Sequence, residues 1–328
     1  MPKIATKADV TLSGATMGTI WQVVVDEPLS DAARMALQAA CQAAVDEVDD
    51  LMSTWRPDSA LMRFNAAPVG EWHDLPGPLL AVLEAGLAMG VATEGAFEMN
   101  VGEAVRAWGF GPEPIDLDAI RKASGQPPVS ARDALAVDRW LGRARKAAPM
   151  MLDLCGIAKG YGVDRLVETA LAHGIARALC SIDGEVRALG CRANGQAWAV
   201  GIDAPDDVER GGHSVILLAD AAVATSGDYR HFLTIRGTRL SHTIQPEKAA
   251  PVVQTPASVT VLAQSCMLAD AMATALMVMG RDRGVDHARE AGISALFLDR
   301  DGRAVGTGLF DSAAETGHSP DAKARVPA

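Results

Sequence analysis

The chain has 328 residues, of which 49 % are hydrophobic and 22 % are charged, and its formal net charge is −11 at pH 7. This composition excludes intrinsic disorder as the main state, because it provides enough apolar side chains for a sizeable core. The acidic balance argues against a nucleic-acid-binding protein and against binding to anionic lipid, since both need a basic surface. An anionic ligand would have to be held locally, by backbone amides, a few cations or a metal ion.

The cysteines are odd in number and widely spaced, and no two of them form a CxxC pair. This pattern predicts neither a disulfide framework nor a zinc site, so we expect free thiols that are buried. The five are Cys41, Cys155, Cys180, Cys191 and Cys266.

No part of the sequence has the pattern of a membrane segment. Residues 1–19 lack the apolar stretch of an export signal and a cysteine at a lipidation position, and no run of about 18 apolar residues follows. We expect no transmembrane segment and a cytoplasmic location, or a periplasmic one if an export signal has been trimmed.

Four segments have the apolar spacing that is typical of helices. Ser30 can cap the first of them, in which apolar residues recur up to Met52, and Gly95 and Gly174 follow two others as terminators. The expected helices are the segment after Ser30, about 78–94, about 158–173, and 265–279.

Short β-branched or alternating segments predict strands, several of them joined by glycine-containing turns such as Asp183-Gly184. Helices first and many antiparallel strands afterwards favour an α+β fold over a doubly wound sheet. We expect one domain over residues 1–310 and a frayed, polar tail over 311–328. The expected strands are 20–25, 178–182, 186–189, 198–202, 214–218, 232–235, 239–244, 258–263, 295–299 and 303–309.

The helix at 265–279 carries two polar side chains beyond its first turn, Asp270 and Thr274. They are four residues apart and project from the same face, so they are plausible oxygen ligands for a hard cation such as Mg²⁺. Two alternatives without a metal ion stay open. Asp270 can pair with a distant arginine, and Thr274 can donate to the carbonyl one turn back.

A second cluster lies at 153–161, where a strand-like entry at 150–154 meets a glycine-rich turn that opens a helix. Such a helix start offers free N–H groups and a positive dipole end to an anion, and Lys159 can add a charge. Asp153 would oppose that charge unless a metal or a ligand N–H lay between them. The alternative is a tight turn with Lys159 as a solvated surface charge.

Three weaker signals complete the set. The polar run at 224–230 follows a strand and also has the composition of an ordinary β-turn. His242 lies on an expected strand, where a histidine is more often structural than a base. Trp55 stands among polar residues and can stack on a planar ring or cover a helix end. Neither GxGxxG after the first strand nor GxxxxGK[ST] is present. Together the segments favour a nucleotide diphosphate held by a metal ion, a helix start and an aromatic platform.

The same segments, in this order, resemble the FAD:protein FMN transferase family, also called the thiamine-biosynthesis-lipoprotein family. The resemblance covers the chain from about Thr16 to Gly308. The matching motifs are 17–19 (MGT), 53–59 (STWRPDS), 63–65 (RFN), 95–98 (GAFE), 108–112 (WGFGP), 153–161 (DLCGIAKGY), 224–229 (ATSGDY), 242–246 (HTIQP) and 269–274 (ADAMAT).

The resemblance implies a single α+β domain of the tunnelling-fold type, with a mainly antiparallel sheet and flanking helices. It implies a flavin transferase that uses Mg²⁺, cleaves FAD and transfers FMN to a Thr or Ser hydroxyl of an acceptor flavoprotein, releasing AMP. His242 would help to deprotonate that hydroxyl. The implied metal ligands are Gly156, Asp270 and Thr274. The implied FAD contacts are Met17, Trp55, Ala96, Phe97, Glu98, Asp153, Lys159 and Ile244.

Three positions depart from the family pattern. Gln245 replaces an aspartate after the histidine segment, Asp183 replaces the first residue of a Gly-Gly pair, and Glu98 replaces a shorter aspartate. These departures concern the transfer step more than the binding of FAD and Mg²⁺. Two alternatives therefore stay open: an FAD pyrophosphatase that makes FMN and AMP, and a non-catalytic FAD-binding protein.

Overall fold

The computed structural model describes residues 9–125, 128–204, 212–228, 232–235, 238–253 and 256–313. The helices are α1 (Asp31–Met52), α2 (Ala60–Ala66), α3 (Gly77–Ala92), α4 (Gly102–Ala107), α5 (Leu117–Gly125), α6 (Ala131–Ala134), α7 (Ala158–Ala172), α8 (Cys266–Met279) and α9 (Arg281–Glu290), with 3-10 turns η1 (Pro246–Lys248) and η2 (Gly308–Ala313). The strands are β1 (Val10–Thr16), β2 (Thr19–Val25), β3 (Trp72–Asp74), β4 (Leu135–Asp138), β5 (Arg143–Lys146), β6 (Ala178–Ile182), β7 (Glu185–Leu189), β8 (Trp198–Asp203), β9 (Gly212–Leu218), β10 (Ala222–Gly227), β11 (Phe232–Ile235), β12 (Thr238–Ser241), β13 (Ile244–Gln245), β14 (Ala250–Pro251), β15 (Ser258–Ala263), β16 (Ser294–Leu298) and β17 (Ala304–Gly306).

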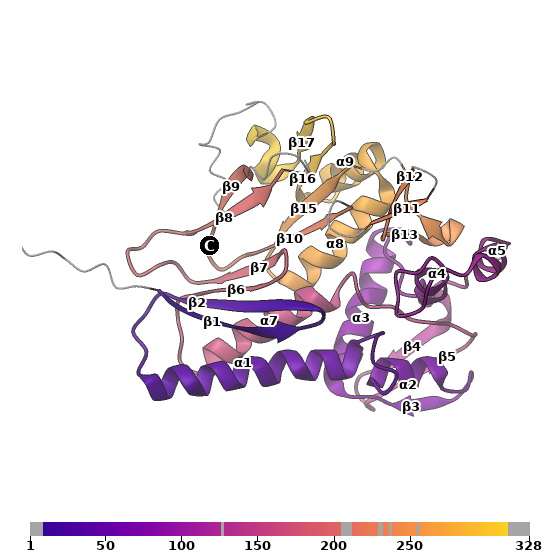
Figure 1. The fold of residues 1–328 in the computed structure, drawn as a ribbon, viewed down its shortest axis with the longest axis horizontal. Coiled ribbons are helices and arrows are strands. Elements are labelled where there is room, and N and C mark those ends of the chain that lie inside the picture. The colour runs from indigo at the N-terminus through magenta and orange to yellow at the C-terminus, as the bar shows by residue number, and fades with distance from the viewer. Residues whose placement is uncertain are drawn as a thin grey trace, which may run out of the picture.

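An eight-stranded sheet in the order β1-β2-β6-β7-β10-β15-β16-β17 forms the centre (Figure 1). Every neighbouring pair in it is antiparallel. Successive side chains of a strand point to opposite faces, and β2 follows that rule. Val23 and Val25 pack with α1 and α7 on one face, whereas Val24 packs with the β8–β9 hairpin on the other. The expected α+β fold with a mainly antiparallel sheet and flanking helices is confirmed.

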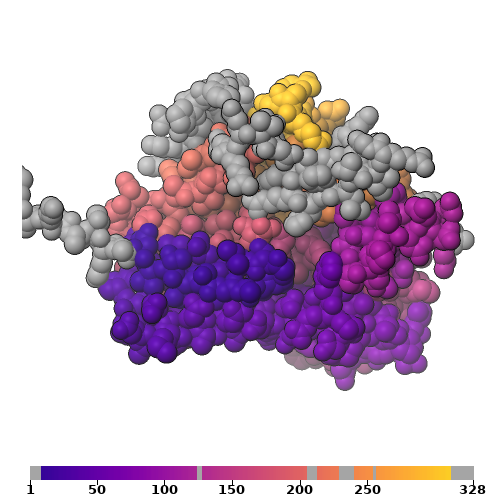
Figure 2. All heavy atoms as spheres, viewed as in Figure 1, coloured from indigo at the N-terminus to yellow at the C-terminus, as the bar shows by residue number. Residues whose placement is uncertain are grey.

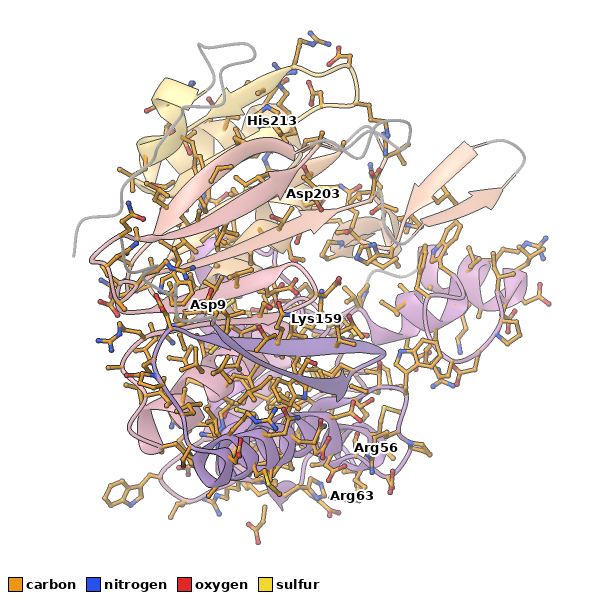
Figure 3. The ribbon with its side chains drawn as sticks, turned by 60° about the vertical axis from the view of Figure 1, so that its left-hand side comes forward. Asp9, Arg56, Arg63, Lys159, Asp203 and His213 are labelled. Atoms are coloured by element: carbon orange, nitrogen blue, oxygen red, sulfur yellow. The ribbon has the colours of Figure 1, made fainter. Side chains whose placement is uncertain are left out.

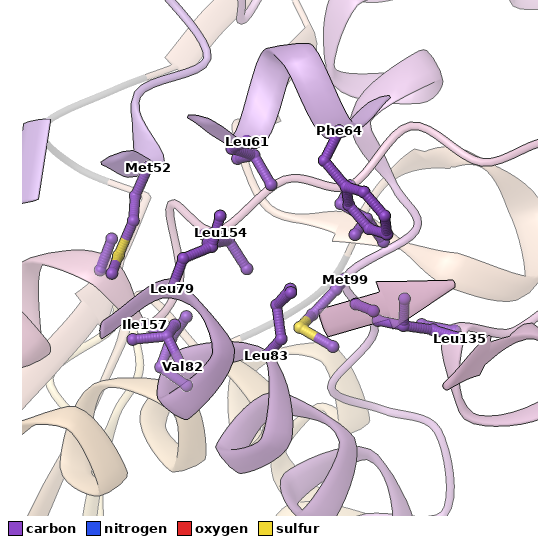
Figure 4. Close-up of a cluster of buried hydrophobic side chains, with 14 of the residues drawn as sticks. Met52, Leu61, Phe64, Leu79, Val82, Leu83, Met99, Leu135, Leu154 and Ile157 are labelled. Atoms are coloured by element: carbon purple, nitrogen blue, oxygen red, sulfur yellow. The ribbon is translucent and has the colours of Figure 1, made fainter. Parts of the chain in front are cut away.

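A further hydrophobic cluster joins α2, α3 and the β3-β5-β4 sheet to the segment that precedes α7 (Figure 4). Phe64, Leu83 and Leu154 are among its fully buried side chains. The same cluster includes Ala271 and Ala275 of α8. The helix that carries the predicted metal ligands is therefore packed from two sides, against this cluster and against the central sheet.

The predicted helices are confirmed within a few residues at each end. The Ser30 hydroxyl accepts a hydrogen bond from the N–H of Ala33 at the start of α1, and Ser265 accepts one from Leu268 at the start of α8. Gly95 and Gly174 follow α3 and α7 with φ values of 87° and 77°, a region that glycine adopts without steric cost.

One strand prediction was wrong, and one strand was missed. The strand expected at 239–244 is broken into β12 and β13, and His242 lies in the break. An ordinary β-turn was one interpretation of the polar run at 224–230, but residues 224–227 belong to β10 in the middle of the sheet. The hydroxyls of Thr225 and Ser226 lie 2.8 and 3.0 Å from those of Thr260 and Thr274. Asp228 follows β10 and is buried, and residues 229 and 230 lie outside the described residues.

The last part of the chain also differs from the prediction. The strand expected at 303–309 is shorter, since β17 ends at Gly306 and η2 follows. Residues 311–313, expected in the tail, belong to η2, while 314–328 lie outside the described residues. The sequence patterns also missed β1, β3 to β5, α2, α4 to α6 and α9.

The strand-like entry at 150–154 pairs with no strand among the described residues, and two asparagines hold it instead. Asn65 accepts from the N–H of Leu152 and donates to its carbonyl, at 2.8 and 2.9 Å. Asn100 accepts from the N–H of Met151 at 2.8 Å. These bonds replace a sheet ladder and fix the approach to α7.

The outer edge of the sheet at β1 is covered by side chains of α1. Gln38 and Gln42 donate from their amide groups to the carbonyls of Ser13 and Ala15, at 2.9 and 3.0 Å. The oxygen of Gln42 also accepts from the indole N–H of Trp21 at 2.9 Å.

The cysteines are free, as expected, but their burial was predicted only in part. Three are buried, whereas Cys155 and Cys191 are exposed. Within the described residues, no helix combines the length and the apolar character needed to cross a membrane.

Candidate active site

A cavity of about 890 Å³ lies where α7, α8 and the ends of the central strands meet the segments 94–98 and 242–246. Every residue predicted for the site lines this cavity, although these residues are up to about 250 positions apart in the chain. Figure 2 shows the indigo N-terminal elements and the magenta α4–α5 segment on the same face of the molecule, and both contribute lining residues, Met17 and Val105.

Three groups with oxygen atoms that could bind a metal ion line the cavity close to one another. Asp270 and Thr274 are one turn apart on α8, and Gly156 precedes α7. A Cβ built on Gly156 would lie only 3.0 Å from the hydroxyl oxygen of Thr274, so the side chain of any other residue would crowd this hydroxyl. The hydroxyls of Thr274 and Ser226 lie 3.0 Å apart. The predicted convergence of these three residues is thus present in the structure.

Asp270 has a partner that sequence patterns did not indicate. Its Oδ2 accepts a hydrogen bond from the N–H of Gly160 at 2.9 Å, in the first turn of α7. This N–H is one of the groups expected to bind an anion of a ligand, and here the anion is the Asp270 carboxylate itself. This hydrogen bond between Gly160 and Asp270 links α8 to the first turn of α7.

Burial makes Asp270 an unusual carboxyl group, because only 4 % of the residue is exposed. Burial, together with the nearby charge of Glu185, raises the pKa of Asp270 to about 7, against the opposing effects of Lys159 and the Gly160 N–H. A cation bound to the carboxylate would favour its ionised form.

The donor chemistry fits a hard divalent cation. Carbonyl, carboxylate and hydroxyl oxygens are the ligands that Mg²⁺ takes, with water and substrate phosphate completing its shell. The described residues contain no cluster of three His, Cys, Asp or Glu side chains that could hold a metal ion. A cation here would therefore depend on Gly156 and Thr274 as well as on Asp270.

Lys159 is a cavity residue and no solvated surface charge. Its side chain lines the cavity and is 30 % exposed, against 45 % for that of Arg56, and Figure 3 shows where both residues lie. The ammonium group of Lys159 lies 2.9 Å from Glu185 Oε1 and 3.4 Å from Asp183 Oδ2. Burial alone would lower the pKa of Lys159, but Glu185, Asp270 and Asp183 outweigh it and raise the pKa above the ordinary value.

Glu185 is the main residue that the sequence reasoning missed. It is 2 % exposed, and burial raises its pKa in spite of the neighbouring Lys159. The available signal was an acidic residue directly after the Asp183-Gly184 turn, at the first position of a buried strand. Asp153, which was expected to oppose Lys159, instead accepts from the N–H of Cys155 at 2.8 Å. Burial also raises the pKa of Asp153.

The other lining residues come from turns and short connections. Met17 has a φ of 44° in the β1–β2 turn, and the side chain of Trp55, just after α1, is exposed. His242 lies between β12 and β13, with its ring centroid 6.5 Å from that of Phe110 in an edge-on arrangement. Ile244 is buried at the start of β13. An imidazole and an exposed indole thus share one cavity with the oxygen donors.

The segment 94–98 is held firmly, and Glu98 has a structural use there. The hydroxyl of Thr93 accepts from the N–H of Phe97 at 3.0 Å, which fixes the neighbouring Ala96 and Phe97 at the cavity. The Glu98 carboxylate accepts from Asn100, Ser130 and Ala131. Its oxygens hold the start of α6, in addition to any contact with a ligand.

Comparison with known proteins assigns the chain to a family. The sequence model of the ApbE family matches residues 17–297. The chain belongs to the ApbE family. It is 36 % identical over 291 residues to the FAD:protein FMN transferase of Vibrio cholerae serotype O1, covering 88 % of this chain and 87 % of that protein. It is 33 % identical over 300 residues to the FAD:protein FMN transferase of Escherichia coli strain K12, covering 89 % and 84 %.

Solved structures of ApbE proteins have the same fold. The apo form of the Pseudomonas stutzeri flavinyl transferase ApbE matches with a TM-score of 0.82 at 31 % identity, covering 97 % of this chain and 100 % of that one. The flavin transferase ApbE of Vibrio cholerae matches with a TM-score of 0.81 at 34 % identity, covering 93 % and 99 %. The resemblance inferred from the short motifs is therefore confirmed over nearly the whole chain.

Proposed function

We propose that this protein is an FAD:protein FMN transferase, which uses Mg²⁺ to transfer FMN from FAD to a Thr or Ser hydroxyl of an acceptor flavoprotein. The observation that carries the proposal is the single cavity in which the oxygen donors of α8 meet Lys159 and His242. Family membership and full-length similarity to proteins named for this activity support it.

The reaction exchanges the phosphoanhydride bond of FAD for a phosphate ester of the acceptor hydroxyl. The acceptor hydroxyl oxygen forms a bond to the phosphorus of the FMN half, the bond between that phosphorus and the bridging oxygen breaks, and AMP leaves with the bridging oxygen. Such transfers depend mainly on positioning and on neutralisation of charge. A divalent cation at Gly156, Asp270 and Thr274 would supply that neutralisation and orient the diphosphate.

The protein's own side chains have distinct tasks in this proposal. Lys159 faces the diphosphate as a fixed cation, and Trp55 offers an exposed indole on which a flat ring can stack. His242 takes the proton from the acceptor hydroxyl, because a neutral imidazole is a suitable base near pH 7. Gln245 cannot supply the negative charge of an aspartate. Its backbone pairs with that of Ala250 and so joins β13 to β14.

The test is incubation of the full chain with FAD, Mg²⁺ and a candidate acceptor protein, followed by a denaturing gel and the intact mass of the acceptor. We expect covalent flavin fluorescence on the acceptor, and the Vibrio cholerae relative serves as the positive control. Absence of covalent flavin while the control succeeds contradicts the proposal. In that case FMN and AMP without acceptor identify a pyrophosphatase, and unchanged FAD bound to the protein identifies a binding protein.

A further inference from the structure

The hairpin β13–β14 begins directly after His242. Its two strands are antiparallel, and the N–H of Val252 donates to the carbonyl of Thr243 at 2.9 Å, which extends the pairing by one residue. His242, Thr243 and Ile244 all line the cavity. The place of the imidazole in the cavity therefore depends on how this hairpin is held.

The tip of the hairpin is held by α4. Ala249 lies there with a φ of 47°, a left-handed conformation that side chains disfavour and that persists only where the surroundings impose it. Its carbonyl accepts a hydrogen bond from the indole N–H of Trp108, the residue after α4, at 3.0 Å. Ala249 is 3 % exposed and belongs to one hydrophobic cluster with Ile244 and with Ala104 of α4.

The other end of α4 is anchored to the segment that leads to Gly156. The N–H of Gly102 donates to the carbonyl of Met151 at 2.9 Å, and the side chain of Asn100 accepts from the N–H of Met151 at 2.8 Å. A Cβ built on Gly102 would lie 2.6 Å from the Met151 carbonyl oxygen, so this contact requires glycine. The helix α4 thus connects the segment before Gly156 to the hairpin after His242.

We propose that Trp108 is a positioning residue for His242. Its indole N–H fixes the tip of the hairpin, and the hairpin in turn fixes the backbone next to the imidazole. Phe110, on the same connection after α4, adds the edge-on contact with the His242 ring. This inference rests on the proposed function, because it takes His242 as the base that receives the proton of the acceptor hydroxyl.

The experiment measures the rate of FMN transfer by the full chain in saturating Mg²⁺, and the Kd for FAD by flavin fluorescence. Trp108→Phe removes the indole N–H and keeps an aromatic ring. Trp198→Phe is the matched control, since the Trp198 indole donates to the carbonyl of Gly190 at 3.1 Å outside the cavity lining. Both substitutions are also combined with His242→Ala, and thermal melts verify that each variant is folded.

We expect Trp108→Phe to lower the transfer rate about 10-fold, because a small displacement of a reacting group is costly to the rate. The Kd for FAD should change less than about threefold. In the His242→Ala background the same substitution should have little further effect on the rate, since the two residues act in one step. Trp198→Phe should lower the melting temperature and leave the rate unchanged in both backgrounds.

An unchanged rate in Trp108→Phe, equal losses in rate and in FAD affinity, or the same fall in rate with and without His242 would overturn the inference. If Trp108→Phe does not fold, Phe110→Leu removes the edge-on contact with His242 and must give the same non-additive pattern for the inference to stand. If the wild-type chain transfers no FMN, the proposed function fails and this inference fails with it, a result distinct from all the others.

Discussion

The cavity is built from two kinds of wall, and they differ in how their side chains are held. The helix wall consists of the residues on or next to α7 and α8, namely Gly156, Lys159, Asp270 and Thr274. Its polar groups have partners within the protein, such as Gly160 for Asp270 and Glu185 for Lys159. The charged end of the site is therefore arranged before any ligand binds, at the cost of a buried carboxyl group.

The loop wall consists of Met17, Trp55, Phe110 and His242, which come from turns and short connections. Trp55 is exposed, and His242 occupies a break between two short strands. Loops on a rigid scaffold are a common place for binding and catalytic groups. We propose a division of labour on this basis, in which the helix wall would hold the diphosphate and the loop wall would receive the rings and the acceptor hydroxyl.

Asp270→Ala should have the largest effect, since it removes the charged oxygen donor of the helix wall. We expect FMN transfer to fall at least about 10³-fold, because a divalent ion contributes several kcal/mol to such reactions. Melting in EDTA at pH 8 should show no loss of stability, because the variant also removes a buried charge. Asp282→Ala, in the first turn of α9, is the control. Near-normal transfer by Asp270→Ala would refute the division between the walls.

His242→Ala tests the loop wall. We expect the transfer rate to fall about 10²-fold, which is typical for the loss of a general base, while the Kd for FAD changes less than about threefold. His213 on β9, outside the cavity lining, provides the control substitution His213→Ala (Figure 3). Equal losses in rate and in FAD affinity would identify His242 as a binding residue and not as a base.

The free energy of unfolding, measured against pH in EDTA, tests the raised pKa of Asp270 in the helix wall. The pKa of Asp270 is about 7 in the folded protein and about 4 when unfolded. Between those values the folded state holds a proton that the unfolded state has released, so rising pH favours unfolding. The free energy of unfolding should fall by up to about 1.4 kcal/mol per pH unit relative to Asp270→Asn. A constant difference between the two proteins from pH 4 to pH 7 would contradict the raised pKa.

Glu98→Ala should have the smallest effect on the reaction and a clear one on stability. The substitution leaves the N–H of Asn100 and of Ala131 without their acceptor, which costs about 1–3 kcal/mol. We expect a lower melting temperature and a change in the Kd for FAD of less than about threefold. A large loss of FAD affinity without a loss of stability would show that Glu98 is mainly a ligand contact.

The helix wall could be predicted from sequence because its signals are local. An acid and an alcohol four residues apart in an otherwise apolar helix are visible in α8 alone. The partner of that acid was not predictable, since the Asp270–Gly160 bond joins residues 110 positions apart. Sequence patterns indicated Asp270 and Thr274 as possible metal ligands, the resemblance added Gly156, and neither indicated the protonation state of Asp270.

The elements that were missed owe their structure to tertiary partners. In β10, Thr225 pairs with Thr260 at 2.8 Å and Ser226 with Thr274, so polar side chains that suggest a turn are satisfied inside the fold. In α9, only Gly284, Val285 and Ala288 are buried, which leaves little apolar periodicity to detect. Trp55 and His242 were only weak signals in the sequence, because a single Trp or His on a short connection has no periodic pattern, and the resemblance was needed to give them a role and to add Met17.

The amide groups of Gln38 and Gln42 have a consequence for the behaviour of the protein in concentrated solution. An unprotected edge strand can template the growth of a sheet from one molecule to the next. On β1, the carbonyls of Ser13 and Ala15 already accept hydrogen bonds from side chains of α1. The helix α1 thus hinders the pairing of β1 with a strand of another molecule, and with it aggregation through this edge.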